Sequence, residues 1–282
     1  MINLLKKFLS LIGRRRTYAA LFAIVMSASI LLVPQSGQAF TLLDIIRKGL
    51  PIIQALSIND QQEIALGAQT NQKIVSQMRM SQNREVNEYI NNIGQRLARS
   101  SARPNLKYTF QVVEDNAINA FATMGGYVYI HTGLMKASDN EAQLASVIGH
   151  EIGHITGRHS LEQLKQTLIA QGISSLAGLD QSQLSNVVLN IGLRLPKSRE
   201  MEYDADRRGL DNIIRVGYAP SAMPEFMKKL GSASSAPAFL STHPSPPDRV
   251  QRLNNMIPPQ YRAKTDGLDQ GNYKQRVQYF FR

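Results

Sequence analysis

The segment HEIGHITGRHS, residues 150–160, holds three of the chain's five histidines, and a glutamate directly follows the first of them. Each residue of an α-helix advances by about 100°, so His150 and His154 lie about 40° apart on one face, one turn above the other. Two imidazoles at this spacing can bind one zinc ion. Glu151 lies beside the pair, which suits a base that takes a proton from zinc-activated water. The alternative is a helix that carries histidines at its surface.

His159 does not fit the ligand pattern of this segment. It follows His154 by five residues, which places it about 140° round a continuing helix and away from the metal. A pattern with three histidines would need the third at position 160, where this chain has Ser160. We therefore interpret His159 as a surface or packing residue.

A third ligand is needed, because a catalytic zinc ion takes three protein ligands and keeps one position open. The segment SREMEYDAD, residues 198–206, offers Glu202 and Asp206 on one helical face. Glu202 could bind the metal, while Asp206 accepts the second ring N–H of a ligand histidine. Two acids at this spacing repel each other on an ordinary helix, and a nearby cation relieves the repulsion. A solvated, charged helix face is the alternative.

These two segments resemble the gluzincin zinc metallopeptidases of the CAAX prenyl protease, HtpX, Oma and BepA type. In that family His-Glu-x-x-His precedes a Ser-Arg-x-x-Glu-x-x-Ala-Asp helix. The matching positions of the second motif are Ser198, Arg199, Glu202, Ala205 and Asp206. The segments NAFATMGGYVYIHTGLM and STHPSPPDR resemble the periplasmic BepA-like branch. The resemblance covers residues 59–257, and it implies Glu202 as the third metal ligand and Asp206 as the partner of His150.

His243 lies in a proline-rich stretch, STHPSPPDR, which can hold an imidazole at a fixed place. From the residues alone, three roles stay open. His243 could stabilise the oxyanion of the reaction intermediate, occupy the open zinc position, or have no role. The resemblance implies the second role, a histidine that must leave the zinc before substrate enters. Arg249, in the helix that follows, could pair with Glu202 or contact the substrate.

Apolar residues at three- and four-residue spacing predict the helices that must position these side chains. One covers residues 59–100, the second begins at residue 138 and carries the histidine motif, and two more cover residues 161–195 and 198–218. Ser138 and Glu141 have the spacing of a capping box at the start of the second of these helices.

Two segments predict strands: the alternating residues 106–115, and the β-rich residues 127–132, which two glycines precede. We expect Gly126, Tyr127 and Val128 to form the edge along which an extended peptide binds. His131 on this strand is interpreted as structural. The prediction is a mostly helical α+β fold, a single domain of the zincin type with a small β-sheet beside the histidine-bearing helix.

The first 39 residues contain five basic residues and no acid. An apolar run, YAALFAIVMSASILLV, follows the basic stretch, and Gly37 and Ala39 fit a cut before Phe40. We predict a cleaved signal peptide over residues 1–39, with an uncleaved anchor as the alternative, and a metallopeptidase domain over residues 40–282. The domain would then work outside the cytoplasm, in a periplasm or lumen.

Composition excludes some classes of function. The formal net charge is +11, of which +6 remains after residue 39. The remaining basic residues alternate with acids and form no stripe with aromatic residues, so we do not predict nucleic-acid binding. An exported chain without cysteine has no disulfides, so its stability comes from its core and any bound metal. The apolar segment 42–58 could associate with a membrane surface, but we favour its packing on its own domain.

The sequence thus predicts an exported zinc endopeptidase that binds one Zn²⁺ ion per chain through His150, His154 and Glu202, with Glu151 as general base. The resemblance implies unfolded or misassembled envelope proteins as substrates, and protein quality control as the role. It also implies a helical-repeat domain, which we do not find after residue 257. Two alternatives stay open: a chaperone or assembly factor whose zinc is permanently closed by His243, and a metal-free binding module.

Overall fold

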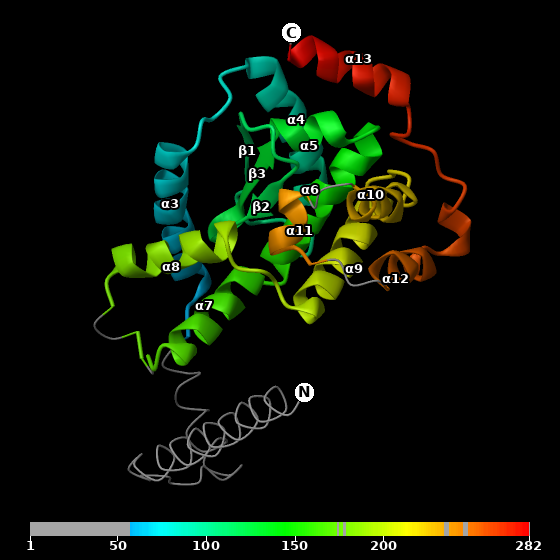
Figure 1. The fold of residues 1–282 in the computed structure, drawn as a ribbon. Coiled ribbons are helices and arrows are strands. Elements are labelled where there is room, and N and C mark those ends of the chain that lie inside the picture. Colours follow the sequence, from blue (N-terminus) through cyan, green and yellow to red (C-terminus); the bar gives the residue numbers. More distant parts are fainter. Residues whose placement is uncertain (1–56, 174, 177–178, 234–236, 245–247, 282) are drawn as a thin grey trace, which may run out of the picture. The chain divides into compact units, whose positions relative to one another are not determined.

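Figure 1 shows the fold in a computed structural model, which describes residues 57–281 except 174, 177–178, 234–236 and 245–247. The predicted signal peptide and most of the apolar segment 42–58 lie outside the described residues. In chain order the elements are α3 (Asp60–Gln77), α4 (Arg84–Arg99), β1 (Thr109–Val113), β2 (Ala120–Ala122), η1 (Met124–Gly126), β3 (Tyr127–His131), α5 (Thr132–Ala137), α6 (Glu141–Thr156), α7 (His159–Ala170), α8 (Gln181–Leu193), α9 (Arg199–Arg215), α10 (Ala222–Gly231), α11 (Ala238–Thr242), α12 (Arg249–Met256), η2 (Pro259–Tyr261) and α13 (Gln270–Phe280).

Helix α6, which carries the histidine motif, runs through the middle of the domain, and nearly all of its residues are buried. Its N-cap is Asn140, whose side chain accepts a hydrogen bond from the main-chain nitrogen of Gln143 at 2.9 Å. The predicted capping box that starts at Ser138 is wrong. Ser138 instead donates back to the carbonyl oxygen of Leu134, because α5 ends at the residue before it.

Helix α9 packs against α6 at very short range. A side-chain carbon on Gly153 of α6 would lie 2.6 Å from the carbonyl oxygen of Ala205. A side-chain carbon on Gly209 of α9 would lie 2.9 Å from the main-chain nitrogen of His150. Because both contacts involve main chain, neither helix can move aside cheaply. The two glycines therefore bring the acidic face of α9 directly against the histidines of α6.

The sheet has the order β1–β3–β2, with β3 parallel to β1 and antiparallel to β2. Strand β3 is thus hydrogen-bonded on both sides, and the prediction that Gly126, Tyr127 and Val128 form an edge is wrong. Gly126 lies in the turn η1, whereas Tyr127 and Val128 begin the central strand. Within the described residues the edge beside α6 is β2, which is only three residues long and therefore too short to show an alternating pattern.

The rest of the chain follows the predicted fold class, a mostly helical α+β domain. The predicted helix 59–100 is two helices, α3 and α4, and the predicted helix 161–195 is also two, α7 and α8. Helix α13 near the C-terminus was not predicted. The larger core cluster joins α4, the sheet, α6 and helices α10 to α13, while α3, α7 and α8 enclose a smaller one. None of the helices described here is both long and apolar enough to cross a membrane.

The contact between α6 and α9 gives a test of the fold. We expect Gly153→Ala to lower the free energy of unfolding by about 1–3 kcal/mol, because the added carbon overlaps the main chain of α9. Urea denaturation measures the change. Gly231→Ala in α10 is the matched control, since an added carbon there meets nothing within 4 Å. Equal stability of Gly153→Ala and the unmodified protein would contradict the packing described here.

Candidate metal centre

Four buried side chains form a compact cluster: His150 and His154 from α6, Glu202 from α9, and His243 at the end of α11. One possible ligand atom of each lies within 4.8 Å of those of the other three. The Nε2 atoms of His150 and His154 lie 3.0 Å apart, and they lie 3.5 Å and 3.3 Å from the Glu202 carboxylate. Nitrogen and oxygen ligands in such a group are those that a tetrahedral zinc ion takes.

The hydrogen bonding of this cluster fits a bound cation. Within the described part of the chain, neither Glu202 carboxylate oxygen makes a hydrogen bond, and neither does Nε2 of His243. A buried carboxylate is unfavourable unless a cation compensates its charge. Arg249 lies 2.8 Å from Glu202 but also pairs with Asp206, so its single positive charge does not balance both carboxylates. The adjacent Nε2 atoms of His150 and His154 are also better explained by a shared ion, because each ring has an acceptor for its proton at Nδ1. The residues therefore fit zinc.

Burial and charge act differently on the three histidines. Burial lowers the pKa of His150, but its hydrogen bond to Asp206 and the nearby Glu202 carboxylate outweigh this and raise the pKa to about 9. Burial lowers the pKa of His154 to about 3 and that of His243 well below its usual range. Histidine binds metal through an unprotonated nitrogen, so His150 must lose its proton when metal binds, whereas the other two are already neutral.

Asp206 and Arg249 support one side of the cluster. The Nδ1 atom of His150 lies 2.9 Å from Asp206 Oδ1. The buried Arg249 guanidinium donates to both Asp206 oxygens, and its Nη1 lies 2.8 Å from Glu202 and 3.3 Å from the carbonyl oxygen of Pro244. All three guanidinium nitrogens therefore contact protein acceptors. Of the two alternatives for Arg249, the geometry favours pairing with Glu202 over contact with a substrate.

Glu151 lies directly beside the cluster, with Oε1 3.4 Å from Nε2 of His243. Burial raises its pKa to about 7. The buried Lys197, which the sequence analysis missed, places a positive charge near Glu151, and that charge lowers the Glu151 pKa in part. Its Nζ donates to the carbonyl oxygen of Ile191, and its main-chain N–H donates to Thr242. No sequence signal distinguishes this lysine, because lysines are usually exposed.

The ring of His243 is held by two residues of α11. It stacks on Phe239, with ring centroids 4.3 Å apart and an interplanar angle of 13°. Its Nδ1 atom lies 3.1 Å from Thr242 Oγ1 and 3.2 Å from the carbonyl oxygen of Phe239. The proline-rich residues 245–247, which we expected to fix this ring, lie outside the described residues. These contacts direct Nε2 toward the other members of the cluster.

His159 is buried and contacts a predicted ligand, so of its two interpretations, a surface or a packing residue, the first is wrong. Its Nδ1 lies 2.8 Å from Nδ1 of His154, and its Nε2 lies 3.2 Å from Asp204 Oδ2. The helical angle misleads here because α6 ends before Gly157 and Arg158 is left-handed, with φ 55° and ψ 32°. The glycine was the one sequence signal that the helix stops before His159.

His131, the remaining histidine, lies on β3 and does not belong to the cluster found among the described residues. Its ring packs edge-on against Phe121, and its Nδ1 lies 3.8 Å from Asp115. This position is in keeping with a structural role.

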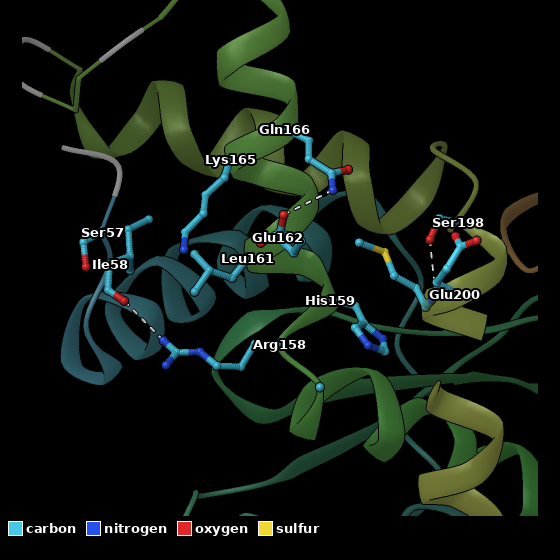
Figure 2. A pocket seen from close by; sticks show the side chains of 12 residues that line it. Ser57, Ile58, Arg158, His159, Leu161, Glu162, Lys165, Gln166, Ser198 and Glu200 are labelled. Atoms are coloured by element: carbon cyan, nitrogen blue, oxygen red, sulfur yellow. Dashed lines mark hydrogen bonds between the residues drawn. The ribbon is translucent and has the colours of Figure 1, made fainter. Parts of the chain in front are cut away.

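A surface pocket of about 700 Å³ lies near the cluster, between the first turns of α7 and α9 and residues 57–58. Figure 2 shows His159 among its lining residues and Arg158 donating to the carbonyl oxygen of Ile58. The charged side chains around the pocket carry both signs. None of the four cluster residues lines it, so we do not assign substrate binding to this pocket.

Comparison with known proteins gives several relatives. The chain is 35% identical to a putative β-barrel assembly-enhancing protease of Vibrio cholerae, over 58% of this chain and 38% of that protein. It is 35% identical to mitochondrial metalloendopeptidase OMA1 of Schizosaccharomyces pombe, over 60% of this chain and 52% of that protein. It is 32% identical to the β-barrel assembly-enhancing protease of Escherichia coli, over 61% of this chain and 39% of that protein. The chain thus spans about half or less of the length of these relatives.

The model of peptidase family M48 matches residues 84–257. This region contains all four residues of the cluster, together with Glu151 and the carboxylate and guanidinium groups that support it. The resemblance seen in the sequence motifs is confirmed, and because the match covers more than half of the chain, the chain belongs to peptidase family M48.

Proposed function

We propose that the chain is a zinc-dependent endopeptidase that binds one zinc ion through His150, His154 and Glu202. The observation that carries the proposal is the position of Glu151, a buried carboxylate without a hydrogen-bond partner among the described residues, directly beside the cluster of ligand atoms. A structural zinc site has no use for such a base. The names of the relatives, which include protease and metalloendopeptidase, support the same reaction.

Bound zinc would supply Lewis-acid chemistry, polarising a peptide carbonyl and acidifying water. Glu151 takes a proton from the attacking water and passes it to the leaving amine. Asp206 accepts the Nδ1 proton of His150 and so leaves Nε2 free for the metal. Arg249 pairs with both Asp206 and Glu202 and compensates part of their negative charge in a buried place.

The edge of β2 is the better candidate for binding an extended substrate. Thr123 donates to the carbonyl oxygen of Tyr127, and Asn119 accepts from His131. Because alternate residues of an antiparallel strand bond to the same neighbour, the main-chain groups of Ala120 and Ala122 point to the outer side. The main chain of Ala122 also lowers the pKa of Glu151, so this edge borders the base. A peptide could add there through main-chain hydrogen bonds.

We infer that His243 acts as a removable fourth ligand. Its Nε2 lies within reach of the other ligand atoms and 3.4 Å from Glu151, so it covers the position that the attacking water needs. The same closure favours one alternative, a chaperone or assembly factor in which four protein ligands hold a structural zinc ion.

The substrates and the compartment extend this proposal. We infer that the chain cuts misfolded or misassembled envelope proteins outside the cytoplasm, after export by a signal over residues 1–39. Support comes from the names of relatives that enhance β-barrel assembly and from the basic and apolar pattern of the first residues.

Glu151→Gln separates the enzyme from the chaperone. We expect casein cleavage by the purified protein to fall at least about 100-fold, because the variant lacks the base, while about one zinc ion per chain is retained. Cleavage is followed with fluorescent casein and zinc by elemental analysis. If the unmodified protein binds zinc and is as inert as the variant, the chaperone is favoured. If it binds no zinc, the metal-free module is favoured.

His243→Ala tests the removable ligand. We expect faster casein cleavage with zinc still bound, because three protein ligands remain and the fourth position opens. Ser241→Ala is the matched control, since Ser241 is exposed and bonds only within α11. A rate equal to that of the unmodified protein, or loss of the zinc ion, would contradict this role for His243.

A further inference from the structure

The two ligand histidines of α6 are held in different ways at Nδ1. His150 faces a carboxylate directly, that of Asp206. His154 faces a second histidine, His159, whose far nitrogen faces the Asp204 carboxylate. Both carboxylates come from α9, the helix that also supplies Glu202. The structure thus holds one ligand ring directly and the other through an intervening imidazole.

Metal binding by His154 would decide where each proton lies in these contacts. His154 can bind a metal through Nε2 only if its proton is on Nδ1, so Nδ1 donates to His159. His159 must then accept at Nδ1 and carry its own proton on Nε2, which lies 3.2 Å from Asp204. The Asp204 carboxylate accepts a hydrogen bond from that N–H. From His154 through His159 to Asp204, every donor therefore meets an acceptor.

The main chain between α6 and α7 is shaped to allow these contacts. Arg158 adopts a left-handed conformation with φ 55°, which is unfavourable for a residue other than glycine. Its guanidinium is anchored by Asp60, Glu63 and the carbonyl oxygen of Ile58. Strain that is held in place by its surroundings points to a function for the strained segment. Here the turn interrupts the helix, so that His159 Nδ1 lies 2.8 Å from Nδ1 of His154.

Gly157 completes the arrangement. A side-chain carbon at this position would lie 2.4 Å from Nε2 of His159 and 2.9 Å from Oδ2 of Asp204. Its own φ of −79° and ψ of −8° are accessible to any residue, so glycine is needed here for space and not for conformation. Alanine at 157 would therefore separate His159 from Asp204 without removing a polar group.

We propose that His159 and Asp204 form a positioning pair, which holds the ring of His154 in its metal-binding tautomer and orientation, and that the turn at Gly157 and Arg158 serves to close this pair. The pair touches neither substrate nor metal, and it acts through His154. The proposal rests on the zinc-ligand role of His154 in the proposed function, but not on peptidase activity.

The test measures zinc affinity of the purified, metal-free protein by competition with a chromophoric chelator. We expect His159→Ala and Gly157→Ala each to weaken zinc binding by about 10- to 100-fold, the usual effect of losing a group that orients a metal ligand. His159→Gln should recover part of the loss, because its side-chain oxygen can accept the proton of His154. His131→Ala, which removes a buried histidine on β3, is the matched control and should keep its zinc affinity.

A circular dichroism spectrum of each metal-free variant shows whether it is folded. If His159→Ala does not fold, the Gly157→Ala and His159→Gln variants decide the question. Zinc affinities within about twofold of the unmodified protein would overturn the positioning role and leave His159 as packing. An unmodified protein that binds no zinc would overturn the metal site itself. Normal zinc binding, weakened in the variants but without casein cleavage, would support the pair and contradict the peptidase.

Discussion

The close packing of α6 on α9 is the contact on which the site depends. Glycines at Gly153 and Gly209 let the two helices meet main chain to main chain. The carboxylates of α9 are thereby brought into a buried space beside imidazoles, where unpaired negative charge is strongly unfavourable. Arg249 compensates part of that charge, and the ligand cluster fits a cation that would compensate the rest. The packing of α6 on α9 thus creates both the excess negative charge and the group of ligands that fits a cation.

The members of the cluster differ in how firmly they are held. His150 and His154 lie on a buried helix, and both have an acceptor for the Nδ1 proton. Glu202 comes from the helix packed against them. His243 comes instead from the end of α11, a helix of five residues, and is held by a ring stack and two contacts at Nδ1. His243, the residue proposed to move, is therefore placed by the shortest of the three helices that supply the cluster.

In the sheet, the short strand β2 is the one that borders Glu151 with an unpaired side, and the longer strand β3 is not. The β-rich segment that draws attention in the sequence becomes the central strand, with both edges occupied. The edge strand next to Glu151 consists of the three buried residues Ala120–Ala122. Strand order depends on pairing between distant segments, so it could not be predicted from the alternation of residues within one strand.

The sequence by itself determined the local features of this protein. The spacing of His150 and His154, and that of Glu202 and Asp206, each follow from residues within one helix, where periodicity fixes geometry. The family motif combines these two local patterns. Only the tertiary structure decided what happens between elements. The left-handed turn at Arg158 brings His159 to His154, and packing buries Lys197. Such contacts depend on the dihedral angles of a single turn and on long-range packing, and neither leaves a periodic signal in the chain.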